Sequence, residues 1–409
     1  MPSRRDRILV LAGLVLVALS LRSAATAVSP LLDDLRADIG IGTGGIGLLG
    51  LLPPTCFAVV GAVTPAIGRR LGLERTLVAS LLISAVGSAT RPLAGDTPTF
   101  LVLSAVTLSG MAMGNVLLPP LVKRHFPGQI GAVTSAYVVL VSLGAALPPY
   151  TDVPLEAAFG WRVALGAWAL VAVLAILPWL TQLRRTAAER SAAPRTRIPV
   201  LRSRRAWGLT VLFAMTSLNV YSLFAWLPEI LVDAGVTRAS AGLLLGLYAT
   251  LGIPPSLVMP IVTARMANPF PLILLFAAFF LIGYGGLLFN PGSMTWLWVV
   301  MAGLGPSSFP MSLTMINLRT TSPAGSAGLS GMVQGIGYAI AGGGPLVFGL
   351  LHDGTGAWNA SLLLLCGTVL VSVVAGWFAC RPGTVEAELG LLVPAGDQPG
   401  TQVPTRTAP

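Results

Sequence analysis

The chain has 409 residues, of which 54% are hydrophobic and only 10% are charged, and its mean hydropathy is +0.81. Soluble globular domains carry about 25% charged residues, so this composition excludes a soluble domain and makes the bilayer the expected solvent. A formal net charge of +10 would suit a nucleic-acid binder, but the placement of the basic residues favours a role in membrane topology.

Twelve apolar segments are each close to the roughly 20 residues that a membrane-spanning helix needs. Their ranges are 8–31, 43–68, 75–93, 98–122, 128–150, 161–182, 207–232, 239–264, 270–289, 294–317, 326–351 and 358–380. The basic start at Arg4, Arg5 and Arg7 resembles a signal peptide, but the apolar segment after it is too long for one and further spans follow. We therefore expect an uncleaved first helix and an all-α integral membrane protein with 12 transmembrane helices.

The two halves of the chain repeat each other. Ser20, Leu21 and Arg22 correspond to Ser217, Leu218 and Asn219, and Gly131, Pro148 and Trp161 correspond to Gly328, Pro345 and Trp358, all 197 residues apart. This register predicts two parallel six-helix pseudo-repeats with a substrate site between them near mid-membrane. We expect an N-terminal bundle at 1–182, a basic cytoplasmic linker at 183–205, a C-terminal bundle at 206–381 and a disordered cytoplasmic tail at 382–409.

The charges indicate how the chain is oriented. An even number of spans places both termini on one side, and most basic residues fall on that side, in short connections and in the 183–205 linker. The other side carries Arg36, Arg91, Arg162 and Arg238 together with most of the acidic residues. This bias predicts a multi-pass protein of the plasma (inner) membrane with both termini in the cytoplasm. The linker also predicts contact with anionic membrane lipid, and no nucleic-acid partner is expected.

Arg22 is the candidate that matters most, because it is the charged side chain that this pattern places deep inside an apolar segment. Burying it there costs a few kcal/mol, so we expect it to face an aqueous cavity. Its guanidinium presents a planar set of donors that suits carboxylate-like or nitrate-like groups. A single arginine favours a monoanion over a phosphate ester. The alternative is a structural arginine bound by carbonyls at the helix break near Pro30.

Further polar and aromatic side chains in the spans are candidate substrate ligands: Asn115, Asn219, Gln334, Tyr338, Tyr137, Tyr221 and Trp226. Gln334 and Tyr338 are four residues apart and share one helix face. For the amides, the alternative is an interhelical hydrogen bond that holds the bundle together. For Trp226, it is the interfacial belt in which Trp and Tyr collect at span ends.

The sequence offers few residues that could couple transport to an ion or catalyse a reaction. Protons are a candidate coupling ion, and Glu229, Asp33 and Asp34 are the candidate coupling residues, although each lies at a span boundary where ordinary loop charges also occur. No acidic residue is expected inside a span, and His125 and His352 lie at span edges. The three cysteines show no ligand spacing. We therefore expect no enzyme activity, no metal site and no cofactor.

The connection between the second and third spans resembles a degenerate form of the loop motif of the major facilitator superfamily. It runs from Gly61 through Pro65, Gly68, Arg69 and Arg70 to Gly72, and lacks the usual acidic residue. Other stretches resemble the cyanate and 2-nitroimidazole transporter (CynX/NimT) branch of that superfamily. They are Leu21-Arg22 with Pro30-Leu31-Leu32, Gly114–Pro119 with Lys123, Gly160-Trp161-Arg162, Trp226-Leu227-Pro228, and Gly331–Tyr338 with Gly344-Pro345.

This resemblance implies a single-chain inner-membrane carrier that works by alternating access, with the loop motif taking part in gating. The expected cargo is a small anionic or weakly acidic solute, such as a cyanate-like, nitrate-like or small carboxylate ion. The alternative within the same class is an exporter of drug-like or nitroaromatic compounds. From another class, a membrane sensor that binds without transporting would need an output domain, which the 382–409 tail is too short to provide.

Overall fold

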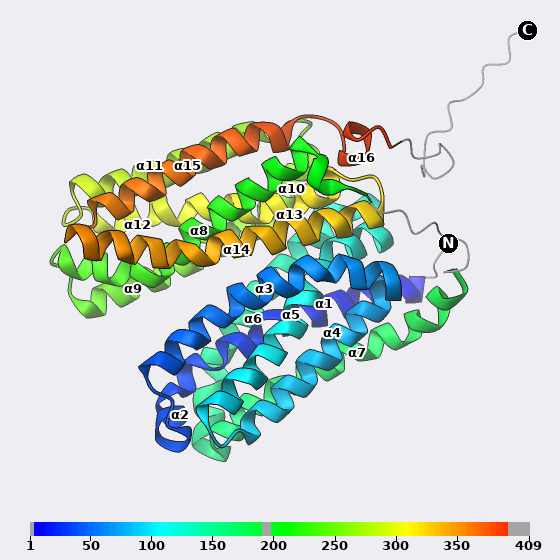
Figure 1. Cartoon of the computed structure of the whole chain (residues 1–409), viewed down its shortest axis with the longest axis horizontal. Coiled ribbons are helices and arrows are strands. Elements are labelled where there is room, and N and C mark those ends of the chain that lie inside the picture. Colours follow the sequence, from blue (N-terminus) through cyan, green and yellow to red (C-terminus); the bar gives the residue numbers. More distant parts are fainter. Residues whose placement is uncertain (1–3, 190–197, 392–409) are drawn as a thin grey trace, which may run out of the picture.

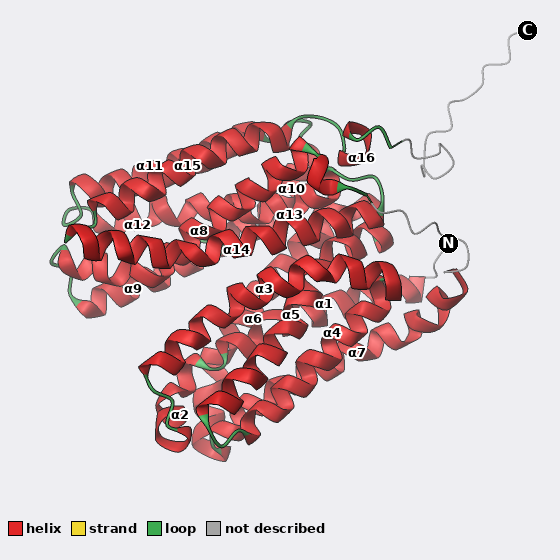
Figure 2. Ribbon diagram, in the orientation of Figure 1, coloured by secondary structure: helices red, strands yellow, loops and turns green. Residues whose placement is uncertain are grey.

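The computed structural model describes residues 4–189 and 198–391, and the regular elements within these ranges are all helical (Figure 2). Twelve helical segments of the described chain are long and apolar enough to cross a membrane. The main helices of the first half are α1 Arg4–Thr26, α3 Thr43–Leu71, α4 Leu73–Thr90, α5 Thr97–His125, α6 Ile130–Phe159 and α7 Trp161–Glu189. Those of the second half are α8 Arg204–Asp233, α9 Arg238–Thr250 with α10 Ile253–Arg265, α11 Phe270–Phe289, α12 Thr295–Leu304 with α13 Ser308–Leu318, α14 Pro323–Thr355 and α15 Asn359–Cys380. Two shorter helices, α2 Leu32–Ile39 and α16 Val385–Glu388, lie outside the spans.

Two of the expected spans are broken helices. The eighth span divides into α9 and α10 just before Pro254 and Pro255, and the tenth divides into α12 and α13 at a 3-10 turn that contains Pro306. Proline removes a backbone donor and its ring obstructs the preceding turn, which explains a break at these two places. The α12/α13 break lies among buried and half-buried residues of the C-terminal bundle, whereas Ile253 and Pro254 at the α9/α10 break are exposed.

The tightest connections depend on glycine. One residue, Gly72, separates α3 from α4 with a φ of 88°, and Gly160 separates α6 from α7 with a φ of 81°. Residues with side chains rarely adopt this left-handed region, so glycine allows the chain to reverse between two spans within a single residue.

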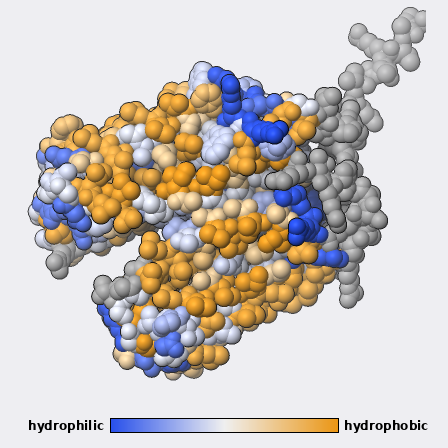
Figure 3. Space-filling model, in the orientation of Figure 1, coloured by the Kyte–Doolittle hydropathy of each residue, from blue (hydrophilic) through white to orange (hydrophobic). Residues whose placement is uncertain are grey.

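The helices form two bundles, α1–α7 and α8–α15 (Figure 1). They meet where α14 packs on α3 and α5 and where α10 packs on α6. Figure 1 shows the bundles converging at the end where α1 begins and α15 ends, and diverging toward α2 and α9. The space-filling view shows a gap between them that widens toward that second end (Figure 3). We refer to these as the closed end and the open end.

Small residues allow the bundles to touch at the closed end. A Cβ atom built on Gly335 would lie 2.9 Å from the backbone nitrogen of Ala62, and one built on Gly331 would overlap Pro65. Hydrogen bonds add to this packing: Lys123 of α5 donates to the carbonyls of Asn317 (2.7 Å) and Thr320, and Ser135 of α6 donates to Leu257. The closed end is therefore sealed by close backbone packing together with polar contacts.

The predicted boundaries at 183–205 and 382–409 need correction. Helix α7 continues through Glu189, and α16 at Val385–Glu388 is an ordered turn of helix within the expected disordered tail. Glu386 of α16 accepts hydrogen bonds from the backbone of Thr321 and Ser322. Residues 190–197 of the linker and 392–409 of the tail lie outside the described residues.

Candidate functional site between the bundles

Arg22 lies between the two bundles, beside two tyrosines of the opposite half. The guanidinium comes from α1, and it lies within electrostatic range of the hydroxyls of Tyr221 on α8 and Tyr338 on α14. Arg22 is partly buried, whereas Tyr338 is 1% exposed. Within the described residues no carboxylate takes part in these interactions. The positive charge therefore meets hydroxyl groups but no counter-ion.

A chain of amide hydrogen bonds lies next to the arginine. Asn115 of α5 donates to the side-chain oxygen of Gln334 on α14 (2.5 Å), and Gln334 donates to Ser330 (2.8 Å). Ser330 in turn donates to the backbone carbonyl of Val116 (2.7 Å). Because the bonds from Asn115 to Gln334 and from Ser330 to Val116 cross from one bundle to the other, the polar cluster must change its contacts whenever the bundles move apart.

Two buried tyrosine hydroxyls retain unused hydrogen-bonding capacity. The Tyr338 hydroxyl faces Arg22 and Asn115, and the Tyr137 hydroxyl of α6 lies within electrostatic range of Tyr338. Neither hydroxyl completes a hydrogen bond of regular geometry within the described chain. A buried polar group without a regular partner is costly, so both hydroxyls are available to a polar ligand.

Aromatic rings form one wall of this cluster. Phe57 of α3 and Phe213 of α8 each pack edge-to-face on Tyr338 at 5.1 Å between ring centroids, and the Tyr221 ring lies 6.4 Å away. The site therefore combines one cation, several neutral donors and apolar ring surface. Six of the predicted candidates come together here: Arg22, Asn115, Tyr137, Tyr221, Gln334 and Tyr338.

Two predicted substrate ligands lie elsewhere. Asn219, 1% exposed, donates to Met215 and Thr368 (both 2.8 Å) and accepts from the Tyr284 hydroxyl (2.7 Å), all within the C-terminal bundle. These bonds correspond to the alternative considered for it, an interhelical bond. The Trp226 indole donates to the carbonyl of Pro345 (2.8 Å) and packs against Trp358, nearer the open end.

The predicted coupling residues are surface groups. Asp33 pairs with Arg36 on α2 at 3.1 Å, and its side chain is 94% exposed. Asp34 is partly exposed beside it, and Glu229 is exposed near the end of α8. None of the three is near Arg22 in the contacts of the described chain.

The loop motif divides into two parts. Gly61 and Pro65 face α14 at the closed end, and Gly68 packs near Leu73 and Leu117. Arg69 and Arg70, at the end of α3, are exposed. The glycine and proline positions of the motif thus lie on the surface that seals the two bundles together.

The sequence reasoning missed a second buried charge site. Arg91 is 1% exposed and donates to the carbonyl of Ala24 on α1 (2.9 Å), and Asp152 of α6 is fully buried and accepts from the Trp168 indole (2.9 Å). The two charges interact electrostatically. Arg22 is therefore not the sole charge inside the spans, and an acidic residue does lie within a spanning helix. The expected fifth span ended at 150, whereas α6 continues to Phe159.

Two helical bundles that meet around a central polar cluster, with 12 potential membrane spans, define a multi-pass membrane transporter of small solutes. The chain matches the sequence profile of the Major Facilitator Superfamily over residues 13–342 and belongs to that family. It is not an enzyme.

Its relatives include the 2-nitroimidazole transporter of Escherichia coli (strain K12), which is 35% identical over 387 residues that cover 93% of this chain and 97% of the relative. The cyanate transport protein CynX of the same organism is 30% identical, covering 88% and 95%. Among solved structures, the proton:xylose symporter XylE matches with a TM-score of 0.75 at 12% identity, covering 95% of this chain and 100% of that one. This last likeness concerns the fold alone.

Proposed function

We propose that the protein is a secondary carrier of a small monoanion or weak acid, with Arg22 as the electrostatic anchor. The observation that carries this proposal is the position of the guanidinium, which lies between the bundles and faces Tyr221 and Tyr338 without a carboxylate partner in the described chain. Buried charges in membrane proteins are normally paired, so an anionic substrate is the natural partner for this one.

The neighbouring groups suit a small planar anion. Arg22 offers parallel donors, while the Tyr338 and Tyr137 hydroxyls have regular bonding capacity to spare. In a site of low dielectric each of these contacts is stronger than it is in water. Cyanate-like, nitrate-like and small carboxylate ions match this donor set, and the relative named for cyanate transport supports the same class.

Alternating access follows from the two-bundle arrangement. The bundles touch at the closed end and separate at the open end, so a rocking motion about the Arg22 cluster would expose it to one side and then the other. We propose that both termini are cytoplasmic in the plasma (inner) membrane, because the basic connections gather at the closed end. The structure then represents the outward-facing state.

A second cargo is favoured by the aromatic wall. Phe57 and Phe213 flank Tyr338 edge-to-face, which would suit the ring of a drug-like or nitroaromatic compound. A nitro group is planar and has two acceptor oxygens, so it could also accept hydrogen bonds from Arg22. The relative named as a 2-nitroimidazole transporter supports this alternative, in which the protein acts as an exporter. Such a cargo should depend less on Arg22 and more on the rings.

Ligand-induced thermal shift on the purified protein separates the two cargoes. Cyanate, nitrate, short carboxylates and neutral 2-nitroimidazole are tested on wild type, Arg22→Ala and the surface control Arg36→Ala. A ligand present at 100 times its Kd stabilises the native state by about 2.7 kcal/mol. We expect an anion to raise the Tm of wild type and of the control but not of Arg22→Ala. The Tm of each variant without ligand shows whether it is folded.

An equal response of wild type and Arg22→Ala to an anion would eliminate the anchor role. A response only to 2-nitroimidazole, retained in Arg22→Ala and lost in Phe213→Ala, would favour the nitroaromatic alternative. Uptake of the stabilising compound into proteoliposomes then tests transport itself, and its direction.

A further inference from the structure

A groove of about 630 Å³ runs along the outer surface of the C-terminal bundle, between α8 and α15. Its walls are apolar, with Trp207 and Val211 from α8 and Leu370, Val374 and Phe378 from α15. Both helices are long and apolar enough to span a membrane. The groove therefore lies on the surface that faces the acyl chains of lipids.

Close helix packing gives the groove its floor. A Cβ atom on Gly208 would lie 2.7 Å from the carbonyl oxygen of Ala375, so the two backbones touch there. Large apolar side chains stand on either side of this contact and remain exposed: Trp207 is 42%, Leu370 57% and Val374 62% exposed. These exposed apolar side chains form a surface that suits contact with a hydrocarbon chain.

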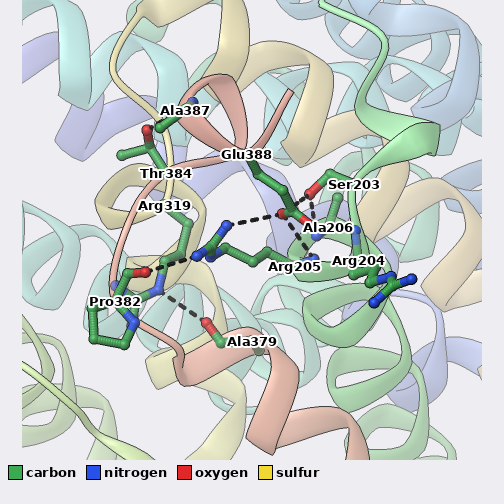
Figure 4. A network of polar contacts seen from close by, with 10 residues as sticks. All are labelled: Ser203, Arg204, Arg205, Ala206, Arg319, Ala379, Pro382, Thr384, Ala387 and Glu388. Carbon is green, nitrogen blue, oxygen red and sulfur yellow. Dashed lines mark hydrogen bonds and ion pairs between the residues drawn. The ribbon is translucent and has the colours of Figure 1, made fainter. Parts of the chain in front are cut away.

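One end of the groove carries positive charge that the protein leaves unpaired. Arg204 lines the groove at the start of α8, and the Arg381 guanidinium lies 5.2 Å from the ring centre of Phe378. Figure 4 shows the neighbouring Arg205 bonded to Glu388 and Pro382, whereas the Arg204 guanidinium points away from this network. Neither Arg204 nor Arg381 forms an ion pair within the part of the chain that the structure describes.

We propose that this groove binds one anionic phospholipid, with its phosphate on Arg204 and Arg381 and one acyl chain along Trp207, Val211 and Val374. The apolar walls lie in the spanning part of α8 and α15, and the two guanidinium groups belong to the ends of these spans, because Arg204 is the first residue of α8 and Arg381 directly follows α15. A zwitterionic lipid would make the same apolar contacts, but its ammonium group would be repelled by the two arginines. Charge at the groove mouth therefore selects the anionic headgroup.

The test uses the full-length protein in detergent, with phosphatidylglycerol or phosphatidylcholine added, and transport plays no part in it. Lipid binding is followed by native mass spectrometry and by the rise in Tm. The variants are Arg204→Gln, which removes the charge, and Val374→Trp, which fills the trough. The control is Arg265→Gln, because Arg265 is an exposed arginine in the last turn of α10, outside the groove lining.

Wild type and Arg265→Gln should bind phosphatidylglycerol more tightly than phosphatidylcholine. Arg204→Gln should bind phosphatidylglycerol about fivefold more weakly, as expected for one arginine near a headgroup. Val374→Trp should lose the bound lipid even though both arginines remain. Equal binding of the two lipids, or an unchanged response of Arg204→Gln, would overturn the proposal. The proposal would also be overturned if wild type formed a dimer that dissociated in Val374→Trp while lipid binding stayed the same. A second copy of the chain would then be what occupies the groove.

Discussion

The Lys123 ammonium of α5 donates a hydrogen bond to the main-chain carbonyl of Asn317 near the end of α13, at 2.7 Å, so a side chain of one bundle caps a helix of the other. A second carbonyl, that of Thr320, accepts from the same ammonium group. Positive charge at a helix C-terminus is favourable because the last carbonyls lack helical partners. Lys123 thereby joins the two bundles at the closed end.

Replacing Lys123 with methionine should favour opening of the closed end. A hydrogen bond to a charged group contributes about 1.5–3 kcal/mol, so the ratio of closed to open forms should fall roughly tenfold or more. Pulsed electron paramagnetic resonance between labels at Arg69 and Arg265, both in the last turns of their helices, would measure this as longer distances. The exposed Arg75→Ala variant is the control. An unchanged distance distribution in Lys123→Met would argue against the latch.

The two candidate asparagines, Asn115 and Asn219, should behave differently. Asn219→Leu leaves the Tyr284 hydroxyl and Thr368 without their partner, so it should lower the unfolding free energy by about 1 kcal/mol and leave ligand affinity unchanged. Asn115→Leu acts at the site between the bundles and should weaken ligand binding. Thermal shift with and without the stabilising anion compares the two. Loss of affinity in Asn219→Leu with normal stability would contradict this assignment.

The sequence predicts the fold well because the bilayer imposes a length and an apolar composition on each span. The sequence also predicts that the site contains Arg22, Asn115, Gln334 and Tyr338, because polar side chains in an apolar helix have to face the protein interior. The repeat register made Asn219 the counterpart of Arg22, but register fixes only a position along a helix. The neighbours Tyr284 and Thr368, from other helices, determine what Asn219 does.

Other errors have different physical causes. Hydropathy predicts that the fifth span ends at 150, which leaves Asp152 outside it, whereas α6 continues to Phe159 and Asp152 is buried within it. Composition predicts a disordered tail after 381, but α16 is held by individual hydrogen bonds that Glu386 and Glu388 accept from nearby backbone and side-chain groups, which composition does not report.

Arg91 and Asp152 should depend on each other for stability. Removing one partner leaves the other buried without the opposite charge with which it interacts, which lowers stability, whereas removing both costs less. We expect the double variant Arg91→Leu/Asp152→Leu to lower the Tm by less than the sum of the decreases caused by Asp152→Leu and Arg91→Leu alone. Chemical or thermal unfolding of the four proteins gives the coupling energy. Strictly additive effects would show that the two charges are energetically independent.

The docking of α16 should weaken in acid. The pKa of Glu388 is lowered from its ordinary 4.5. Partial burial acts to raise this pKa, but it is outweighed by hydrogen bonds from Ser203 and from the backbone of Arg204 and Arg205, and by the charge of Arg205 (Figure 4). A carboxylate with a lowered folded-state pKa contributes its full stability above the unfolded pKa of 4.5. That contribution is lost as the pH falls through the lower, folded value.

Hydrogen exchange of the Val385–Glu388 backbone across pH 3–7, corrected for the intrinsic rate at each pH, would measure this docking. Protection should be constant above about pH 5 and decline at lower pH as Glu388 takes up a proton. Glu388→Gln should show reduced protection at neutral pH together with a flatter profile, because the amide has no charge to lose. A wild-type profile that does not change down to pH 3, or one that Glu388→Gln reproduces, would show that another group holds α16 in place.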